Sequence, residues 1–373
     1  ENKPRFQAIQ EELAHLAARF TPRLPGESDL QQMMGEEARG WRERNRGALV
    51  EADGEALQQL ASNLRGLPHH TARTLVRRAI WDDGSITPQD VPRLIRNKFQ
   101  LLDLQGVLTL EPAVAGFQEV GGLRRLKQWL DLRRQPFLKA SAADAPKGVL
   151  LVGVQGGGKS LAAKAVAGSW GLPLLRLDFG CLYNKWFGET ERNLREALKQ
   201  ADLMAPCVLW LDEMEKGLST GIHDEGVSQR LLGHLLTWLA ERRSRVFLVA
   251  TSNDIERLPP ELVRKGRFDE IFFVDLPDEA TRARILAIHL ERRGLTAEAF
   301  NLPALAADTA GFSGAELEQV VLGAQYASQA RGEPCTDGDL AEVARGTAPL
   351  SRVMAEAVDA LRAWAQDRAV RAD

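Results

Sequence analysis

The chain has 373 residues, of which 44% are hydrophobic and 27% are charged, and these shares exclude disordered, collagen-like and disulfide-scaffold proteins. Its 48 Lys and Arg residues against 51 Asp and Glu residues give a net charge of −3, so no overall positive field attracts nucleic acid or an anionic membrane. The length predicts two or three domains rather than one.

The first 112 residues are predicted to form a helical domain that repeats a pattern found near the end of the chain. In both places a glycine and a large apolar residue are followed by apolar residues at the same four offsets. These are Gly66 with Ala72, Leu75, Val76 and Ala79, and Gly311 with Leu317, Val320, Val321 and Ala324. Flanking segments 24–27 and 87–91 likewise resemble 276–279 and 336–340. Chance similarity of two amphipathic helices is one interpretation; we favour a duplicated helical domain.

From about residue 148, short apolar strands alternate with amphipathic helices. The strands are predicted at 149–152, 174–177, 208–211, 246–251 and 271–274. This alternation is typical of a parallel five-stranded sheet covered by helices, an α/β fold. One-sided helices are expected around 194–201 and 283–290, where apolar residues recur at i, i+3, i+4 and i+7. After residue 279 we expect only helices to the end of the chain.

The segment 153–160, Gly-Val-Gln-Gly-Gly-Gly-Lys-Ser, matches GxxxxGK[ST] between a predicted strand and a predicted helix, which is the context that a phosphate loop requires. Its glycines let backbone N–H groups turn toward phosphates, and the helix N-terminus adds partial positive charge. Lys159 is predicted to contact the β- and γ-phosphates, and the Ser160 hydroxyl to bind Mg²⁺.

The predicted strand at 208–211 ends in two carboxylates, Asp212 and Glu213. Ligands of open α/β sheets bind at the carboxyl ends of strands. About fifty residues after a phosphate loop, the pair predicts Asp212 in the Mg²⁺ shell and Glu213 as the residue that orients or deprotonates the attacking water. Together the two motifs indicate an ATPase.

At this point the sequence resembles the AAA ATPases, over about residues 115–350. The segments 246–253 and 262–269 resemble the family's second region of homology. The resemblance implies that Asn253 is the polar sensor of the γ-phosphate, and that Arg264 and Arg267 are arginine fingers that reach a neighbouring subunit. A guanidinium there would stabilise charge on the transferred phosphoryl group.

Further nucleotide contacts are implied by the same resemblance. Residues 117–123 resemble the segment that meets adenine, and 311–317 resemble the start of the lid helix, with Ser313 and Glu316 as a capping box. The implied nucleotide-binding residues are Val120, Gly121, Gln155, Gly156, Gly157, Gly158, Lys159, Ser160, Leu161, Asp212, Gly314 and Ala315. Gly157 replaces the threonine of most AAA loops, and Ala315 replaces the sensing arginine found outside the classical AAA clade.

Within that clade the chain is similar to a group first noticed as a conserved reading frame of plastid genomes. The group shares the Gln-Gly-x-Gly-Lys-Ser loop, the run at 264–273 and a degenerate first module. By that resemblance the domains are a lid-like helical domain of a degenerate first module (1–112), an α/β nucleotide-binding domain (113–278) and a helical lid with a C-terminal helix (279–373).

Residues 184–189 resemble the aromatic-hydrophobic-glycine pore loop of AAA hexamers, with Lys185, Trp186 and Phe187 at its centre. An aromatic ring lining a channel could grip an extended peptide of any sequence. The alternative is that Trp186 packs within its own domain, which is the commoner environment of tryptophan.

Three cysteines, Cys181, Cys207 and Cys335, stand far apart and form no CxxC pair, which is typical of a reducing compartment. The apolar runs are much shorter than the roughly 20 residues that cross a bilayer, and the start does not have the pattern of a signal peptide. We expect a cytoplasmic protein with no membrane or nucleic-acid partner. Because residue 1 is not methionine, we expect the chain to begin inside a longer protein.

Three classes of function are compatible with these motifs. The favoured one is a homo-oligomeric ring, by resemblance a hexamer, that binds and hydrolyses ATP with Mg²⁺ to remodel or thread a protein. The second is a slowly hydrolysing, nucleotide-switched regulatory scaffold that acts by ATP-dependent binding. The third, a DNA-acting motor, is disfavoured by the net charge and the absence of a basic run. The sequence contains no HExxH segment, so we do not expect a zinc peptidase in this chain.

Overall fold

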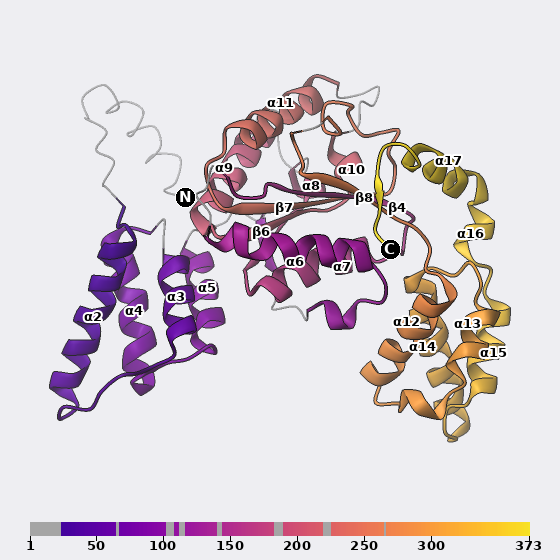
Figure 1. The fold of residues 1–373 in the computed structure, drawn as a ribbon, viewed down its shortest axis with the longest axis horizontal. Helices are drawn as coiled ribbons and strands as arrows, with labels where there is room; N and C mark the ends of the chain where they lie inside the picture. The colour runs from indigo at the N-terminus through magenta and orange to yellow at the C-terminus, as the bar shows by residue number, and fades with distance from the viewer. Residues whose placement is uncertain are drawn as a thin grey trace, which may run out of the picture. The chain divides into compact units, whose positions relative to one another are not determined.

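The computed structural model describes residues 24–64, 67–101, 108–111, 116–139, 144–182, 189–218, 225–264 and 266–373. The chain divides into two compact units, Glu1–Leu94 and Ile95–Asp373 (Figure 1). In the described part of the chain, no helix is both long and apolar enough to cross a membrane.

The first unit is helical, as the sequence predicts. Its elements are α2 (Glu27–Arg44), β1 (Glu51–Ala52), α3 (Gly54–Leu64), α4 (His69–Asp83), β2 (Ser85–Ile86) and the start of α5 (Asp90–Leu101). The helix α2 packs against α3 and α4, and Leu30, Leu60 and Val76 are fully buried. The two short strands pair in parallel.

The second unit contains a seven-stranded sheet in the order β3-β5-β6-β7-β4-β8-β9. Its strands are β3 (Leu108–Glu111), β4 (Gly148–Gly153), β5 (Leu174–Leu177), β6 (Cys207–Leu211), β7 (Val246–Ser252), β8 (Glu270–Val274) and β9 (Val370–Arg371). The central five are parallel to one another, which confirms the predicted sheet. Every residue of β4, β6 and β7 is buried, because helices cover both faces.

Two short edge strands were not predicted. The strand β3 runs antiparallel to β5, and β9 runs parallel to β8. The expectation of helices alone after residue 279 is therefore wrong at Val370 and Arg371. Two residues are too few to produce an alternating pattern in the sequence. The next residue, Ala372, holds the strand in place: its N–H donates to the Phe273 carbonyl (2.9 Å), and its carbonyl accepts from the Leu126 N–H (3.1 Å).

Helices pack on both faces of this sheet. They are α6 (Arg124–Lys139), α7 (Lys159–Trp170), α8 (Phe179–Leu182), α9 (Glu189–Met204), α10 (Met214–Leu218) and α11 (Glu225–Glu241), with a 3₁₀ turn, η1 (Phe117–Glu119), before α6. Figure 1 shows α6 and α7 on one face and α9 and α11 on the other. On the first face, Phe137, Trp170 and Phe247 form an aromatic cluster with ring centroids 4.5–5.7 Å apart.

The C-terminal helices α12 to α15, here called the lid, form a separate core. The elements from here on are α12 (Glu279–Arg292), η2 (Ala297–Ala299), α13 (Leu302–Asp308), α14 (Gly314–Arg331), α15 (Asp337–Gly346), α16 (Leu350–Val353) and α17 (Ala355–Ala365). The lid core gathers Leu286, Phe312 and Val321 among others. The predicted capping box begins α14, because the Ser313 and Glu316 side chains cap each other's backbone N–H groups.

One turn before α5 has the same hydrogen bonds as the turn before α15 of the lid. The Thr87 N–H and hydroxyl donate to Asp90 Oδ2 at 2.8 and 2.9 Å, and the Thr336 N–H and hydroxyl donate to Asp339 Oδ2 at 2.9 and 2.8 Å. This shared turn supports the duplication predicted from the sequence; Gly66 itself lies outside the described residues. The start of α4 differs from that of α14, since Pro68 replaces the capping Ser313.

Candidate functional site

The phosphate loop joins the end of β4 to the start of α7. Gly156 and Gly158 adopt left-handed backbone conformations with φ values of +74° and +96°, which favour glycine. The Lys159 ammonium is buried and donates to the Gly153 and Val154 carbonyls, each at 2.8 Å. Burial lowers the pKa of Lys159 to about 8, against the opposing effect of nearby acidic residues. A bound anion at the loop would therefore contact a positively charged group already held in place.

Hydroxyl and carboxylate oxygens meet beside Ser160, at the ends of β6 and β7. Asp212 Oδ1 accepts from the Thr251 hydroxyl at 2.8 Å and lies 3.5 Å from Ser160 Oγ. This hard-oxygen set suits Mg²⁺. The described residues contain no cluster of three or more His, Cys, Asp and Glu side chains able to hold a metal. Phosphate oxygens and water would therefore have to complete the ion's shell.

Glu213 is held by three contacts. Its backbone has a left-handed φ of +48°, and its N–H donates to the Thr251 hydroxyl at 3.1 Å. Asn253 Nδ2 donates to Glu213 Oε1 at 3.0 Å, and Lys216 Nζ lies 2.5 Å from Oε2. The predicted water-activating carboxylate and the predicted polar sensor are thus directly hydrogen-bonded to each other.

A cavity of about 480 Å³ opens beside the phosphate loop, between the α/β part and the lid. Many of the residues predicted for the nucleotide site line it: Val120, Gly121, Gln155, Gly156, Gly157, Gly158, Lys159, Ser160, Leu161, Asp212, Glu213, Asn253, Gly314 and Ala315. The loop and the lid meet closely, since the Ala315 N–H donates to the Gly156 carbonyl at 3.2 Å. Residues from five separate segments of the chain therefore share one cavity.

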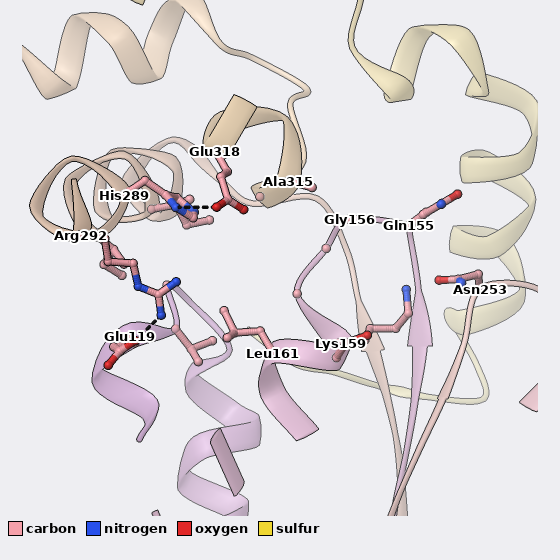
Figure 2. Close-up of a pocket in the computed structure, with 18 of the residues that line it drawn as sticks. Glu119, Gln155, Gly156, Lys159, Leu161, Asn253, His289, Arg292, Ala315 and Glu318 are labelled. Atoms are coloured by element: carbon pink, nitrogen blue, oxygen red, sulfur yellow. Dashed lines mark hydrogen bonds and ion pairs between the residues drawn. The ribbon is translucent and has the colours of Figure 1, made fainter. Parts of the chain in front are cut away.

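Six further lining residues were not predicted: Glu119, Ile285, Ile288, His289, Arg292 and Glu318. Four of them lie on α12 at positions i, i+3, i+4 and i+7, a second face beside the apolar stripe that the sequence predicted. The sequence signal that could have identified this face is the helical spacing of His289 and Arg292 with Ile285 and Ile288. Figure 2 shows His289 facing Glu318 and Arg292 paired with Glu119 across the cavity.

His289 Nδ1 lies 3.8 Å from Glu318 Oε1, and its side chain is only 12% exposed. Burial lowers the pKa of His289; Glu318 opposes this effect, and Arg292 and Arg293 add to it. The folded chain therefore holds this proton less tightly than the unfolded chain does.

We expect the His289→Gln variant to lose less stability in acid than the parent chain. The pKa of His289 in the folded chain lies below its usual value of 6.5. The stability that neutral His289 contributes is therefore complete above pH 6.5 and is lost as the pH falls through the folded pKa. Between about pH 7 and pH 5, the Tm of His289→Gln should decrease by about 2 °C less than the Tm of the parent chain, as measured by differential scanning calorimetry. The exposed His70→Gln is the control. An identical decrease in parent and variant would contradict the prediction.

The two predicted arginine fingers do not line this cavity. Arg264 is exposed, and Arg267 Nη1 donates to the Leu236 carbonyl of α11 at 3.3 Å. The predicted pore-loop residues Lys185, Trp186 and Phe187 lie outside the described residues.

Comparisons with known proteins agree with the architecture. Residues 149–276 match the family described as ATPase family associated with various cellular activities (AAA), and residues 28–105 match the family described as SpoVK-like AAA ATPase, second domain. Over 324 residues the chain is 38% identical to the "Uncharacterized AAA domain-containing protein ycf46" of Pyropia yezoensis, covering 85% of this chain and 66% of that protein. The chain belongs to the AAA ATPase family.

Other AAA relatives show the same pattern. The Guillardia theta protein with the same name is 36% identical over 85% of this chain and 64% of its own length. The crystal structure of the FIGL-1 AAA domain superposes with a TM-score of 0.60 at 24% identity, covering 73% of this chain and 95% of that one. The first likeness confirms the resemblance to the plastid group, and the second confirms the fold. The chain spans about two thirds of the length of these two ycf46 relatives.

Proposed function

We propose that this AAA protein binds ATP with Mg²⁺ and hydrolyses it. The observation that carries the proposal is the single cavity in which the phosphate loop, both carboxylates, Asn253 and the start of α14 converge. A structure of the FIGL-1 AAA domain, similar in fold to this chain, was solved in complex with ADP. Membership of the family and this convergence together support nucleotide binding here.

In the proposed mechanism each residue has a separate role. The loop N–H groups and Lys159 bind the β- and γ-phosphates, and Ser160 and Asp212 would hold Mg²⁺ with its water. Mg²⁺, when bound, neutralises phosphate charge. Glu213 accepts a proton from the attacking water, and Asn253 orients both that water and the Glu213 carboxylate, to which it already donates at 3.0 Å. Lys216 must leave Oε2 for that oxygen to accept the proton.

We further propose a ring oligomer in which Arg264 and Arg267 complete the site of the neighbouring subunit. Neither side chain lines the cavity of its own chain, and a guanidinium is needed to stabilise charge on the transferred phosphoryl group. A protein threaded or remodelled by the pore-loop residues Lys185, Trp186 and Phe187 is the proposed substrate. The cytoplasm is the proposed location.

A slowly hydrolysing scaffold is the second candidate, and one contact favours it. Glu213 Oε2 lies 2.5 Å from Lys216 Nζ, and the hydrogen bond to Glu213 raises the pKa of Lys216 above its usual range. A carboxylate oxygen that already contacts an ammonium group is not free to accept a proton from the attacking water. Turnover that an unfolded polypeptide stimulates would favour the remodeller, and turnover that no polypeptide changes would favour the scaffold.

Mixing two inactive variants tests the shared site. We expect Lys159→Ala chains and Arg267→Ala chains to be inactive separately and to regain ATPase activity when mixed, because some interfaces then pair an intact loop with an intact finger. With random exchange, about a quarter of interfaces would do so. The exposed Arg345→Ala serves as an active control. Failure to regain activity at any ratio, with subunit exchange verified by fluorescence transfer, would contradict fingers in trans.

A further inference from the structure

Behind Asp212, on the side away from Thr251, lies a row of alternating charges. Arg176 Nη2 donates to Asp212 Oδ2 at 3.1 Å, and Arg176 Nη1 lies 3.9 Å from Glu111 Oε1. Lys164 Nζ lies 3.5 Å from the other oxygen of Glu111. The row therefore runs from β3 at the sheet edge through β5 to the carboxylate at the end of β6.

The sheet fixes where Arg176 lies. It stands opposite Trp210 of β6 and Thr109 of β3 in the strand registers. Its guanidinium lies over the Trp210 ring, with Cζ 4.9 Å from the ring centroid. A planar group that stacks on a ring and bonds a carboxylate at its edge has little freedom to turn. Arg176 is thus held against Asp212 by its neighbours.

The charge of Arg176 is permanent, because a guanidinium does not lose its proton in proteins. It is close to the carboxylate that would face Mg²⁺; the Asp212 side chain is 16% exposed and the Arg176 side chain 37%, so water screens the pair only in part. Thr251 holds the other Asp212 oxygen at 2.8 Å. The carboxylate would therefore keep its orientation without Arg176, and the main effect of Arg176 is electrostatic.

We propose that Arg176 is a positioning residue that acts through Asp212 to weaken Mg²⁺ binding at the nucleotide site, and that Glu111 moderates this effect by sharing the guanidinium. This inference rests on the proposed Mg²⁺–ATP site. It gives the edge strand β3 a role beyond completing the sheet, because β3 carries Glu111, the carboxylate that partly neutralises Arg176.

Two substitutions should shift Mg²⁺ binding in opposite directions. Arg176→Met removes a positive charge close to the ion site and should lower the half-saturating Mg²⁺ concentration by about tenfold. Glu111→Gln leaves the arginine uncompensated and, being farther away, should raise that concentration by about two- to threefold. Arg176→Lys keeps the charge and should stay near the parent value.

The measurement uses a fluorescent ATP analogue bound to the whole chain and titrated with Mg²⁺, and binding of the analogue in EDTA gives the Mg²⁺-free reference. Circular dichroism and Tm establish that each variant is folded. Unchanged half-saturation in Arg176→Met, or a shift of Arg176→Met and Glu111→Gln in the same direction, would overturn the inference while leaving the proposed function intact. No binding of the analogue to the parent chain would overturn both.

Discussion

Lys159→Ala is expected to abolish nucleotide binding, with an affinity loss of about a hundredfold or more. The reason is the position of the ammonium group, buried at the centre of the loop and within 2.8 Å of two loop carbonyls. Hydrogen bonds from a charged donor to phosphate oxygens in a site shielded from water are among the strongest in proteins. No other lysine lines the described cavity, so none is placed to replace it.

Isothermal titration calorimetry with ATP measures the loss, and Lys199→Ala is the matched control because Lys199 is exposed on α9, away from the cavity. The control should bind as the parent chain does. Affinity that stays unchanged in Lys159→Ala would rule out the assignment of residues 153–160 as the phosphate loop.

Glu213→Gln is expected to keep ATP binding and to reduce hydrolysis by about 10²- to 10⁴-fold. Glutamine has the same shape and can still accept the hydrogen bond from Asn253, but its amide cannot take a proton from water. The ion pair with Lys216 is lost, while the Glu213 N–H still donates to Thr251 at 3.1 Å. The left-handed turn that positions residue 213 should therefore persist.

Phosphate release under single-turnover conditions, measured beside calorimetric affinity, separates the two effects. Glu256→Gln, which changes an exposed glutamate on the loop after Asn253, is the matched control and should hydrolyse normally. Hydrolysis at the parent rate in Glu213→Gln would show that another group activates the water, and Glu215, whose Oε1 accepts the Asn253 N–H at 3.0 Å, would be examined next.

The sequence predicted the parts of the site that local rules govern. Glycines with left-handed backbone at 156 and 158 and carboxylates at the end of β6 follow from short motifs, and the five parallel strands follow from apolar runs. Arg176 gave no such signal, because an arginine inside a strand ordinarily points to solvent. Its contact with Asp212 depends on which strands are neighbours, and the order β5-β6 is a property of the whole sheet.

The second face of α12 was missed for a related reason. Apolar periodicity identifies the face that packs on the lid core, through Leu286 and Leu290. The face that carries Ile285, His289 and Arg292 lines the cavity because the lid lies against the α/β part, and no pattern within the helix encodes that placement. Two-residue strands such as β9 are below what periodicity can detect.

The path of the chain around β8 determines how the lid can turn. The chain leaves the sheet after Val274, forms the lid, and returns to the same strand at Val370. Arg362 of α17 pairs with Asp275 at 2.9 Å, which ties the returning segment to the departing one. Both ends of the lid segment therefore join the α/β part beside β8, and we expect any opening of the cleft to hinge there. The Asp373 carboxylate, which accepts the Arg124 N–H at 3.2 Å, lies beside that hinge and links it to the segment carrying Val120 and Gly121.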